Sequence, residues 1–239
     1  MLTLYDYSLS GNCYKVRLLL SMLRVPYVRV DVDIKKGESR TDEFLNNVSL
    51  NGKVPTMVIP YGYEHLKKKT PNDASIDLNA TNNSSNIYTE SKNGDDDDDN
   101  NQSTILSESN AILIYLSQNT SLLPSNPIEH AQVMQWLFWE QYSHEPNIAT
   151  LRWWISYLDK SQEPEYLDRI VEKQRNGYEA LNLMEKHLES RKFLVTDRFT
   201  IADVALYAYT HCAEEGNFPK IKAWLKRVEE QPGYIPIND

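Results

Sequence analysis

Three short polar segments hold the residues whose types and spacing could do chemistry. The first, residues 7–16, reads YSLSGNCYKV and places a hydroxyl (Ser10), a carboxamide (Asn12) and a thiol (Cys13) within four residues. The apolar spacing that follows predicts a helix, so these groups lie at its N-terminus, where unpaired backbone amides and the helix dipole favour an anion. A hydroxyl donor there would bind a thiolate better than a thiol, and so lower the pKa of a bound thiol.

A strand, a helix and a second strand are expected to position this first segment. Leu2–Tyr5 reads as a short apolar strand, and Val28, Val30 and Val32 alternate with polar residues, as in a half-buried strand. Between them, apolar residues recur at helical spacing: Val16, Leu19, Leu20 and Leu23. Together these elements predict a βαβ unit.

The other two polar segments flank a predicted hairpin. Residues 51–55, NGKVP, lead into a strand at Thr56–Ile59, and residues 106–112, LSESNAI, lead from its partner strand, Thr104–Leu106, into a helix. Between the strands, the stretch at about 61–103 is rich in Asn, Asp and Ser and has the composition of a disordered insert. We expect a solvated surface loop, with a regulatory or partner-binding role as the alternative.

After residue 124 the strand signals stop and long amphipathic helices begin. Thr200 and Asp203, three residues apart at the start of one helix, are close to a capping box, which is a stabilising feature rather than a site. Strands followed by helices in separate blocks predict an α/β domain at 1–118 and an all-α domain at 125–239. The first long helix is expected to bury one face, made of Ile128, Ala131, Met134, Leu137, Phe138 and Tyr142.

In this order, the three polar segments resemble the glutathione site of the cytosolic glutathione transferases. The Phe-Thr-Ile-Ala-Asp run at 199–203 also resembles the start of a core helix in that family, and the match extends over nearly the whole chain apart from the insert. The Ser-Gly-Asn-Cys-Tyr-Lys run is similar to the Thr-Pro-Asn-Gly turn of fungal and bacterial members related to the yeast nitrogen-regulation prion protein. The resemblance implies a thioredoxin-like N-terminal domain, an all-helical C-terminal domain, glutathione as co-substrate and a homodimer.

Several residues are candidates for stabilising the glutathione thiolate. Ser10 falls where serine-type members, such as the theta and phi classes, carry their catalytic hydroxyl; alternatively it only caps the helix. Asn12 is the second candidate, because the amide of the corresponding turn residue faces the sulfur. Cys13 could instead form mixed disulfides with glutathione, although it lies three residues later and is expected to pack inward. Tyr5 and Tyr7 keep a tyrosine-type mechanism open.

The second and third segments are expected to bind the rest of the tripeptide. If Pro55 is cis, as the resemblance implies, the Val54 backbone can pair with the cysteinyl unit; the alternative is an ordinary trans proline. Lys53 and Arg40 would meet the glycine carboxylate as cations.

The helix start at Glu108 and Ser109 is expected to bind the γ-glutamyl end of glutathione. The Ser109 hydroxyl and the helical amides would take the γ-glutamyl carboxylate, while Glu108 accepts from its amine. The alternative is that the two residues only cap the helix.

A pocket between the domains is expected to take the electrophile. His144 and Glu145 could suggest a metal or an acid–base pair, but no second ligand cluster occurs at suitable spacing, so we expect no metal. The expected pocket walls are Leu9, Tyr142, Arg152 and Trp153.

The charge and cysteine content of the chain limit the kinds of binding partner that we expect. The net charge is −9, of which the stretch 61–103, with nine acidic and four basic residues, carries −5. Nucleic acid is not expected as a partner, because phosphate binding needs a basic face. The two cysteines indicate no disulfide framework, and no apolar run is long enough to span a membrane, so we expect a cytoplasmic protein without membrane contact.

The function that these expectations favour is a glutathione transferase. Such an enzyme would activate the thiolate for attack on a small electrophile, with peroxidase or disulfide-reductase activity as a further possibility. Two alternatives stay open: a non-catalytic interaction or regulatory module with the same fold, and a thiol transferase that works through Cys13.

Overall fold

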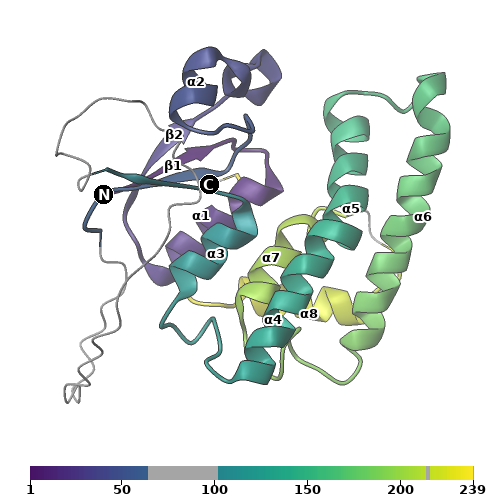
Figure 1. Ribbon diagram of the computed structural model, residues 1–239. Helices are drawn as coiled ribbons and strands as arrows, with labels where there is room; N and C mark the ends of the chain where they lie inside the picture. The colour runs from purple at the N-terminus through teal and green to yellow at the C-terminus, as the bar shows by residue number, and fades with distance from the viewer. Residues whose placement is uncertain (64–101, 214–215, 239) are drawn as a thin grey trace.

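The computed structural model describes residues 1–63, 102–213 and 216–238 (Figure 1). The predicted insert at 61–103 therefore lies almost entirely outside the described residues. Within the described ranges, no helix is long and apolar enough to cross a membrane.

A four-stranded mixed sheet forms the first half of the molecule, with strand order β2-β1-β3-β4. β2 runs parallel to β1, whereas β3 is antiparallel to both β1 and β4. The hairpin expected across the insert forms, with Thr56 opposite Ser107 and Ile59 opposite Thr104. β2 is an edge strand, so Val28 stays 46% exposed. The strands are β1 (Leu2–Asp6), β2 (Tyr27–Asp31), β3 (Thr56–Ile59) and β4 (Thr104–Ser107).

Helices cover both faces of the sheet. α1 (Gly11–Leu23) and α3 (Ser109–Ser117) lie between the sheet and the helical half, while the short α2 (Asp42–Asn47) lies on the opposite side (Figure 1). Every residue from Cys13 to Leu20 is buried. α1 is therefore an interior helix, held on one side by the sheet and on the other by the helical domain. Two short 3₁₀ turns, η1 (Ile34–Lys36) and η2 (Glu38–Arg40), precede α2.

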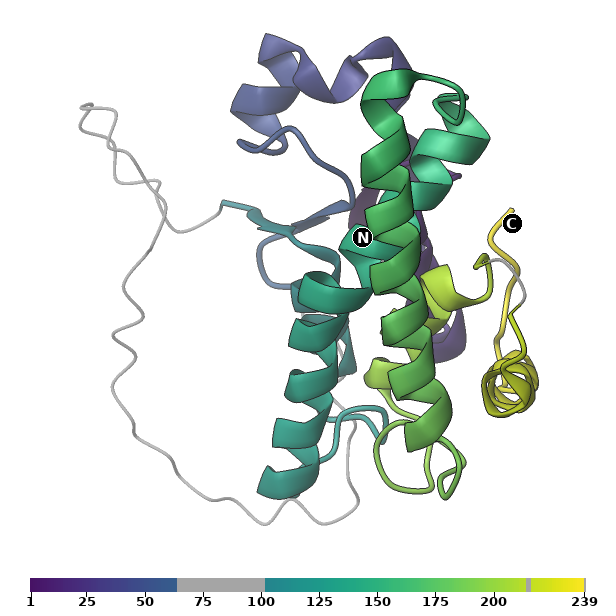
Figure 2. The same cartoon turned by 90° about the vertical axis from the view of Figure 1, so that its right-hand side faces the viewer.

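The second half is built of helices. The first four segments follow one another without a break, and two of them, η3 and η4, are π-helical. α6 runs alongside them in both views (Figure 2). The segments are α4 (Pro127–Trp139), η3 (Glu140–His144), α5 (Glu145–Arg152), η4 (Trp153–Tyr157), α6 (Pro164–His187), α7 (Ile201–Thr210) and α8 (Pro219–Glu229).

One continuous core joins the two halves. All ten residues of α7 are buried, and α7 packs directly on α1. The expected capping box is present: Thr200 N–H donates to Asp203 Oδ2 at 2.9 Å, and Thr200 Oγ1 accepts from Ala202 N–H at 3.3 Å. Asp203 also accepts from Trp224 Nε1 at 2.9 Å, so it stabilises the helical core.

The buried face predicted for the first long helix is largely wrong, since only Leu137 of its six residues is buried. Ile128 and Phe138 are each 71% exposed and Tyr142 is 86% exposed. Besides Leu137, the buried face carries four residues outside the predicted set: Val133, Trp136, Glu140 and His144. The helix has a second apolar row that points outward, and its inward row becomes polar at η3, so hydrophobic periodicity selected the wrong face.

Candidate functional site

The start of α1 carries the predicted donor residues. Ser10 is the N-cap, and its Oγ accepts the backbone N–H of Cys13 at 3.3 Å. The Ser10 hydroxyl also lies beside the Cys13 thiol, which is a weak acceptor. A bound anion would be a much better acceptor for that hydroxyl. Capping the helix and donating to a thiolate are therefore compatible roles for Ser10.

The backbone amides at this helix start are occupied by protein groups, contrary to expectation. Asn12 N–H donates to the Tyr209 hydroxyl at 3.1 Å, and Cys13 N–H is taken by Ser10. Tyr209 comes from α7, so the helical domain itself caps α1. Hydroxyl and amide side chains, rather than these two N–H groups, are left to meet a sulfur anion.

Gly11 is required by this contact. A Cβ at Gly11 would lie 2.5 Å from Cε1 of the Tyr209 ring, which is closer than real Cβ contacts. The ring therefore packs directly on the helix backbone, and only glycine leaves it room.

Replacing Gly11 by Ala should lower the free energy of unfolding by about 1–3 kcal/mol, because the Tyr209 ring must move. Gly177→Ala is the matched control, since a Cβ there meets Ile148 at an ordinary 3.5 Å in the middle of α6. The control should be neutral or stabilising by up to about 1 kcal/mol. Urea unfolding of both variants measures the effect, and equal stabilities would contradict it.

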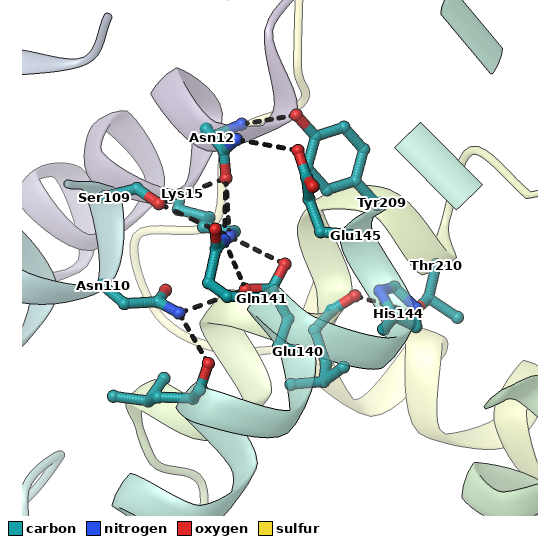
Figure 3. A network of polar contacts seen from close by, with 12 residues as sticks. Asn12, Lys15, Ser109, Asn110, Glu140, Gln141, His144, Glu145, Tyr209 and Thr210 are labelled. Atoms are coloured by element: carbon teal, nitrogen blue, oxygen red, sulfur yellow. Dashed lines mark hydrogen bonds and ion pairs between the residues drawn. The ribbon is translucent and has the colours of Figure 1, made fainter. Parts of the chain in front are cut away.

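The Asn12 carboxamide has a defined orientation. Its Oδ1 accepts from Lys15 Nζ at 2.7 Å, from Ser109 Oγ at 3.1 Å and from Gln141 Nε2 at 3.4 Å. Its Nδ2 donates to Glu145 Oε1 at 3.2 Å (Figure 3). Since three donors converge on the oxygen, the NH₂ group must point away from them. Asn12 can therefore offer a sulfur its second amide hydrogen.

A buried ion pair lies beneath Asn12. Lys15 Nζ is 2.8 Å from Glu140 Oε1, and both side chains are 0% exposed. Glu140 Oε2 accepts from Asn110 Nδ2 at 3.1 Å and from Gln141 Nε2 at 2.8 Å. Lys15 belongs to α1 and Glu140 to η3, so the pair crosses from one domain to the other (Figure 3). Each charge thus has the partners that burial demands.

Lys15 and Glu140 should show strong energetic coupling. Lys15→Met leaves a buried carboxylate unpaired and should cost about 3–5 kcal/mol of stability. The double variant Lys15→Met/Glu140→Leu should lose less than the sum of the single losses, with a coupling of roughly 1–3 kcal/mol. Urea unfolding of the wild type, the two single variants and the double variant measures this coupling. Additive losses of stability would contradict an interaction between Lys15 and Glu140.

Cys13 packs inward, as the sequence analysis expects. Its side chain is 0% exposed, and Tyr7 N–H points at its sulfur, with N and Sγ 3.4 Å apart. Burial, reinforced by the Asp6 carboxylate, raises the pKa of the Cys13 thiol to about 12. A reactive cysteine needs the opposite environment, so the geometry does not suit Cys13 for disulfide exchange.

The two tyrosines pack against other aromatic rings. Tyr5 packs edge-on against Phe44 under α2, with ring centroids 5.7 Å apart. Tyr7 packs against Trp153 at 6.4 Å, and burial together with the Asp33 carboxylate raises the pKa of its hydroxyl. That direction weakens a phenol as a hydrogen-bond donor, so neither residue is favoured for tyrosine-type activation.

The second polar segment adopts the expected geometry. The Val54–Pro55 peptide bond is cis, so the trans alternative is wrong. Lys53 is exposed, and its positive charge acts to lower the pKa of Glu145. Arg40 is also exposed, and its Nη1 donates to the Asn51 carbonyl at 2.9 Å, so it braces the turn before Lys53.

The third segment approaches α1 through Ser109. Ser109 is 5% exposed, and its hydroxyl donates to Asn12 Oδ1. Glu108 is exposed and has a left-handed φ of 69°, a conformation that non-glycine residues rarely adopt. Such strain is retained where the surrounding structure demands it, and it is common at ligand-binding turns. The two residues therefore diverge: Ser109 points into the polar network and Glu108 toward the surface.

Three of the four predicted pocket residues come together. Arg152 Nη1 donates to the Leu9 carbonyl at 3.3 Å, and Trp153 packs on Tyr7. Tyr142 does not join them, since it lies on the outward face of the helix. Tyr157, which the sequence gave no reason to select, completes the group: its hydroxyl accepts from Arg152 Nη2 at 2.5 Å.

A cavity lies behind Arg152, between α5, η4 and α6. Its walls are mostly apolar, and Arg152 is shared between this cavity and the Leu9 turn. The lining residues include Ile148, Leu151, Arg152, Ile155, Tyr178, Leu181 and Cys212.

His144 serves the core rather than a metal site. Its Nε2 lies 2.9 Å from Thr210 Oγ1, which itself donates to the Leu206 carbonyl at 2.7 Å, so His144 Nε2 carries the proton. Complete burial lowers the pKa of His144 to about 4. Among the residues that the structure describes, no group of three or more His, Cys, Asp or Glu side chains could hold a metal.

His144 should make stability depend on pH. The unfolded value of 6.5 lies above the folded value of about 4, so the unfolded chain binds the proton more tightly and stability falls as pH drops through this window. Between pH 7 and pH 5, His144 should contribute a loss of about 2 kcal/mol. Urea unfolding at both values should show a smaller difference in His144→Gln; an equal difference would contradict this assignment.

Family models match two parts of the chain. "Glutathione S-transferase, N-terminal domain" covers residues 9–119, and "Glutathione S-transferase, C-terminal domain" covers residues 153–232. The chain belongs to the glutathione S-transferase family. The predicted family and fold class, a thioredoxin-like α/β domain followed by an all-α domain, are thus confirmed.

Solved structures of glutathione S-transferases resemble the whole chain. A glutathione S-transferase from Pseudomonas fluorescens Pf-5 is 35% identical, with 100% of this chain and 99% of that chain covered and a TM-score of 0.76. A possible glutathione S-transferase from Rhodopseudomonas palustris is 34% identical, with coverages of 100% and 90% and a TM-score of 0.77. Among curated relatives, the disulfide-bond oxidoreductase YfcG of Escherichia coli K12 is 26% identical over 238 residues, 97% of this chain and 92% of the relative.

Sequence reasoning missed the residues that organise the site. Lys15, Glu140 and Tyr209 were not selected, although a lysine inside an otherwise buried helix was a usable signal. Glu140 and Glu145 stood in the polar run of the first long helix, but nothing in their spacing indicated which of them faces α1.

Proposed function

We propose that this glutathione S-transferase binds glutathione as its co-substrate, ionises the thiol at the start of α1 and directs it at a small electrophile. The observation that carries the proposal is the contact between the first and third polar segments, in which Ser109 donates to Asn12, while the second segment adopts the expected cis Val54–Pro55 bond. Ser10 is the proposed thiolate donor and Asn12 its neighbour.

The remaining glutathione contacts follow the three segments. Val54, before the cis Pro55, offers its backbone to the cysteinyl unit. Lys53 and, through the turn it braces, Arg40 attract the glycine carboxylate. The strained turn at Glu108 and the α3 start are proposed for the γ-glutamyl end.

The electrophile is proposed to lie against Leu9, Arg152 and Trp153. This region has aromatic walls, since Trp153 packs on Tyr7 and Tyr157, and a fixed cation in Arg152. Disulfide reduction is the second candidate activity, because a relative that matches nearly the whole chain is named a disulfide-bond oxidoreductase. In that reaction, the attacking thiolate would belong to glutathione and not to the buried Cys13.

A homodimer is also proposed. The outward row of α4 and η3, with Ile128, Phe138 and Tyr142, exposes large apolar side chains that association would cover. The non-catalytic module is not favoured, because the site residues converge and the relatives named above are named as transferases or an oxidoreductase.

Turnover with glutathione and an activated aryl halide tests the proposal. Ser10→Ala should reduce kcat/KM by about 10²–10³-fold, the usual effect of losing one donor to a developing anion. Cys13→Ala should leave kcat/KM within about threefold while lowering stability, because its thiol only packs. If the purified protein neither binds glutathione by calorimetry nor conjugates it, the proposed function is wrong.

A further inference from the structure

A second acid lies at the start of α1, beside the one in the ion pair. Glu145 is the first residue of α5, and its Oε1 accepts from Asn12 Nδ2 at 3.2 Å. Unlike Glu140, it has no ion-pair partner within 4 Å in the described part of the chain. Lys15 is already committed to Glu140 at 2.8 Å. The site therefore holds two carboxyl groups and a single close ammonium.

The surroundings of Glu145 raise the pKa of its carboxyl group. Burial, together with the like charge of Glu140, raises the pKa of Glu145, while Lys15, the Asn12 amide and Lys53 oppose the rise. From α7, the Tyr209 hydroxyl also faces this group, and Glu145 contributes to the raised pKa of Tyr209. A carboxyl whose pKa moves toward neutrality is suited to take up and return a proton near pH 7.

Neighbouring groups are worse proton acceptors. Glu140 is 0% exposed, and its two oxygens are filled by Lys15, Asn110 and Gln141. His144 is fully buried, and burial lowers its pKa to about 4, so it is a weak base near pH 7. Glu145 is half-buried rather than enclosed, so a ligand can reach it.

We propose that Glu145 is the proton acceptor for the thiol of bound glutathione, an inference that rests on the proposed function. The Glu145 carboxylate takes the S–H proton, and the sulfur keeps the bonding electron pair as a thiolate beside Ser10 and Asn12. Because the Glu145 carboxyl becomes neutral as the sulfur becomes negative, the transfer leaves the net charge of the site unchanged. The helical domain thus supplies a catalytic group to the glutathione site.

The proton is accounted for in each reaction. When the thiolate adds to an activated alkene, a C–S bond forms and the resulting carbanion takes the proton back from Glu145. In substitution on an aryl halide, the halide leaves with its bonding pair and Glu145 releases the proton to water. In disulfide exchange, a new S–S bond replaces the old one and the departing thiolate receives the proton.

The pH profile of kcat/KM distinguishes a proton-accepting Glu145 from a Glu145 that only repels the thiolate. In Glu145→Gln, kcat/KM at pH 7 should fall by about 10²-fold, and the acidic limb should move to higher pH, because the thiol must then ionise to bulk water. A carboxylate that only repels the thiolate predicts the opposite: removing it would raise the rate and move the limb to lower pH. Glu145→Asp, which keeps the carboxyl, should retain the position of the limb.

Calorimetric titration of each variant with glutathione keeps the two proposals distinguishable. The dissociation constant of Glu145→Gln should stay within about threefold of wild type, and the control Glu163→Gln, which removes an exposed carboxylate paired with Lys160, should change neither readout. If wild type binds glutathione and the limb of Glu145→Gln stays in place or moves down, the role of Glu145 is overturned. If wild type does not bind glutathione, the proposed function falls first.

Discussion

The buried ion pair between Lys15 and Glu140 is the constraint on which the site depends. A lysine in the middle of the interior helix α1 is tolerable only if a charge of opposite sign meets it without water. That charge comes from Glu140 of the helical domain, so the pair connects the two domains. The same ammonium donates to Asn12 and Ser109, and in this way the pair sets the direction of the Asn12 amide.

Further contacts around the Lys15–Glu140 pair connect the helices of the two domains. On one side the Tyr209 ring packs on Gly11 and its hydroxyl accepts the Asn12 N–H, so a side chain of α7 lies directly on the backbone of α1. On the other side Asn110 bridges α3 to Glu140. The site is thus assembled from α1, α3, η3, α5 and α7, and rigid elements of this kind hold side chains more accurately than loops do.

Local signals predicted the parts of the fold that are fixed locally. The strands, the helix start at Ser10, the hairpin flanks and the Thr200–Asp203 box each depend on residues within a few positions of one another, and each is present. The cis Pro55 bond followed from the resemblance and not from the residue itself. The inward face of the first long helix could not be predicted in the same way, because Glu140 and His144 are buried through partners far away in the sequence, Lys15 and Thr210.

The candidate site residues also divide into those that local sequence indicates and those that depend on distant partners. Ser10, Asn12 and Ser109 were selected because they lie at predicted helix starts, in segments that resemble the glutathione site of the family. Tyr142 was placed in the pocket because it adjoins a polar run, yet a step of one residue along a helix turns a side chain through about 100°. Tyr209 and Glu145 act on Asn12 across more than a hundred residues, and that proximity exists only after both domains have packed.

The π-helical turn at η3 has a consequence for how this chain can vary. A π turn accommodates one residue more than an α-helical turn, and here that turn separates Glu140, which meets Lys15, from Arg152 and Trp153 further along. Deleting a single residue within 141–143 would let this turn return to ordinary α-helical winding, and the residues on either side of it would keep their orientation. Glu140, Glu145 and Arg152 would then keep their partners. Homologous chains that are one residue shorter at this turn can therefore present the same side chains to their substrates.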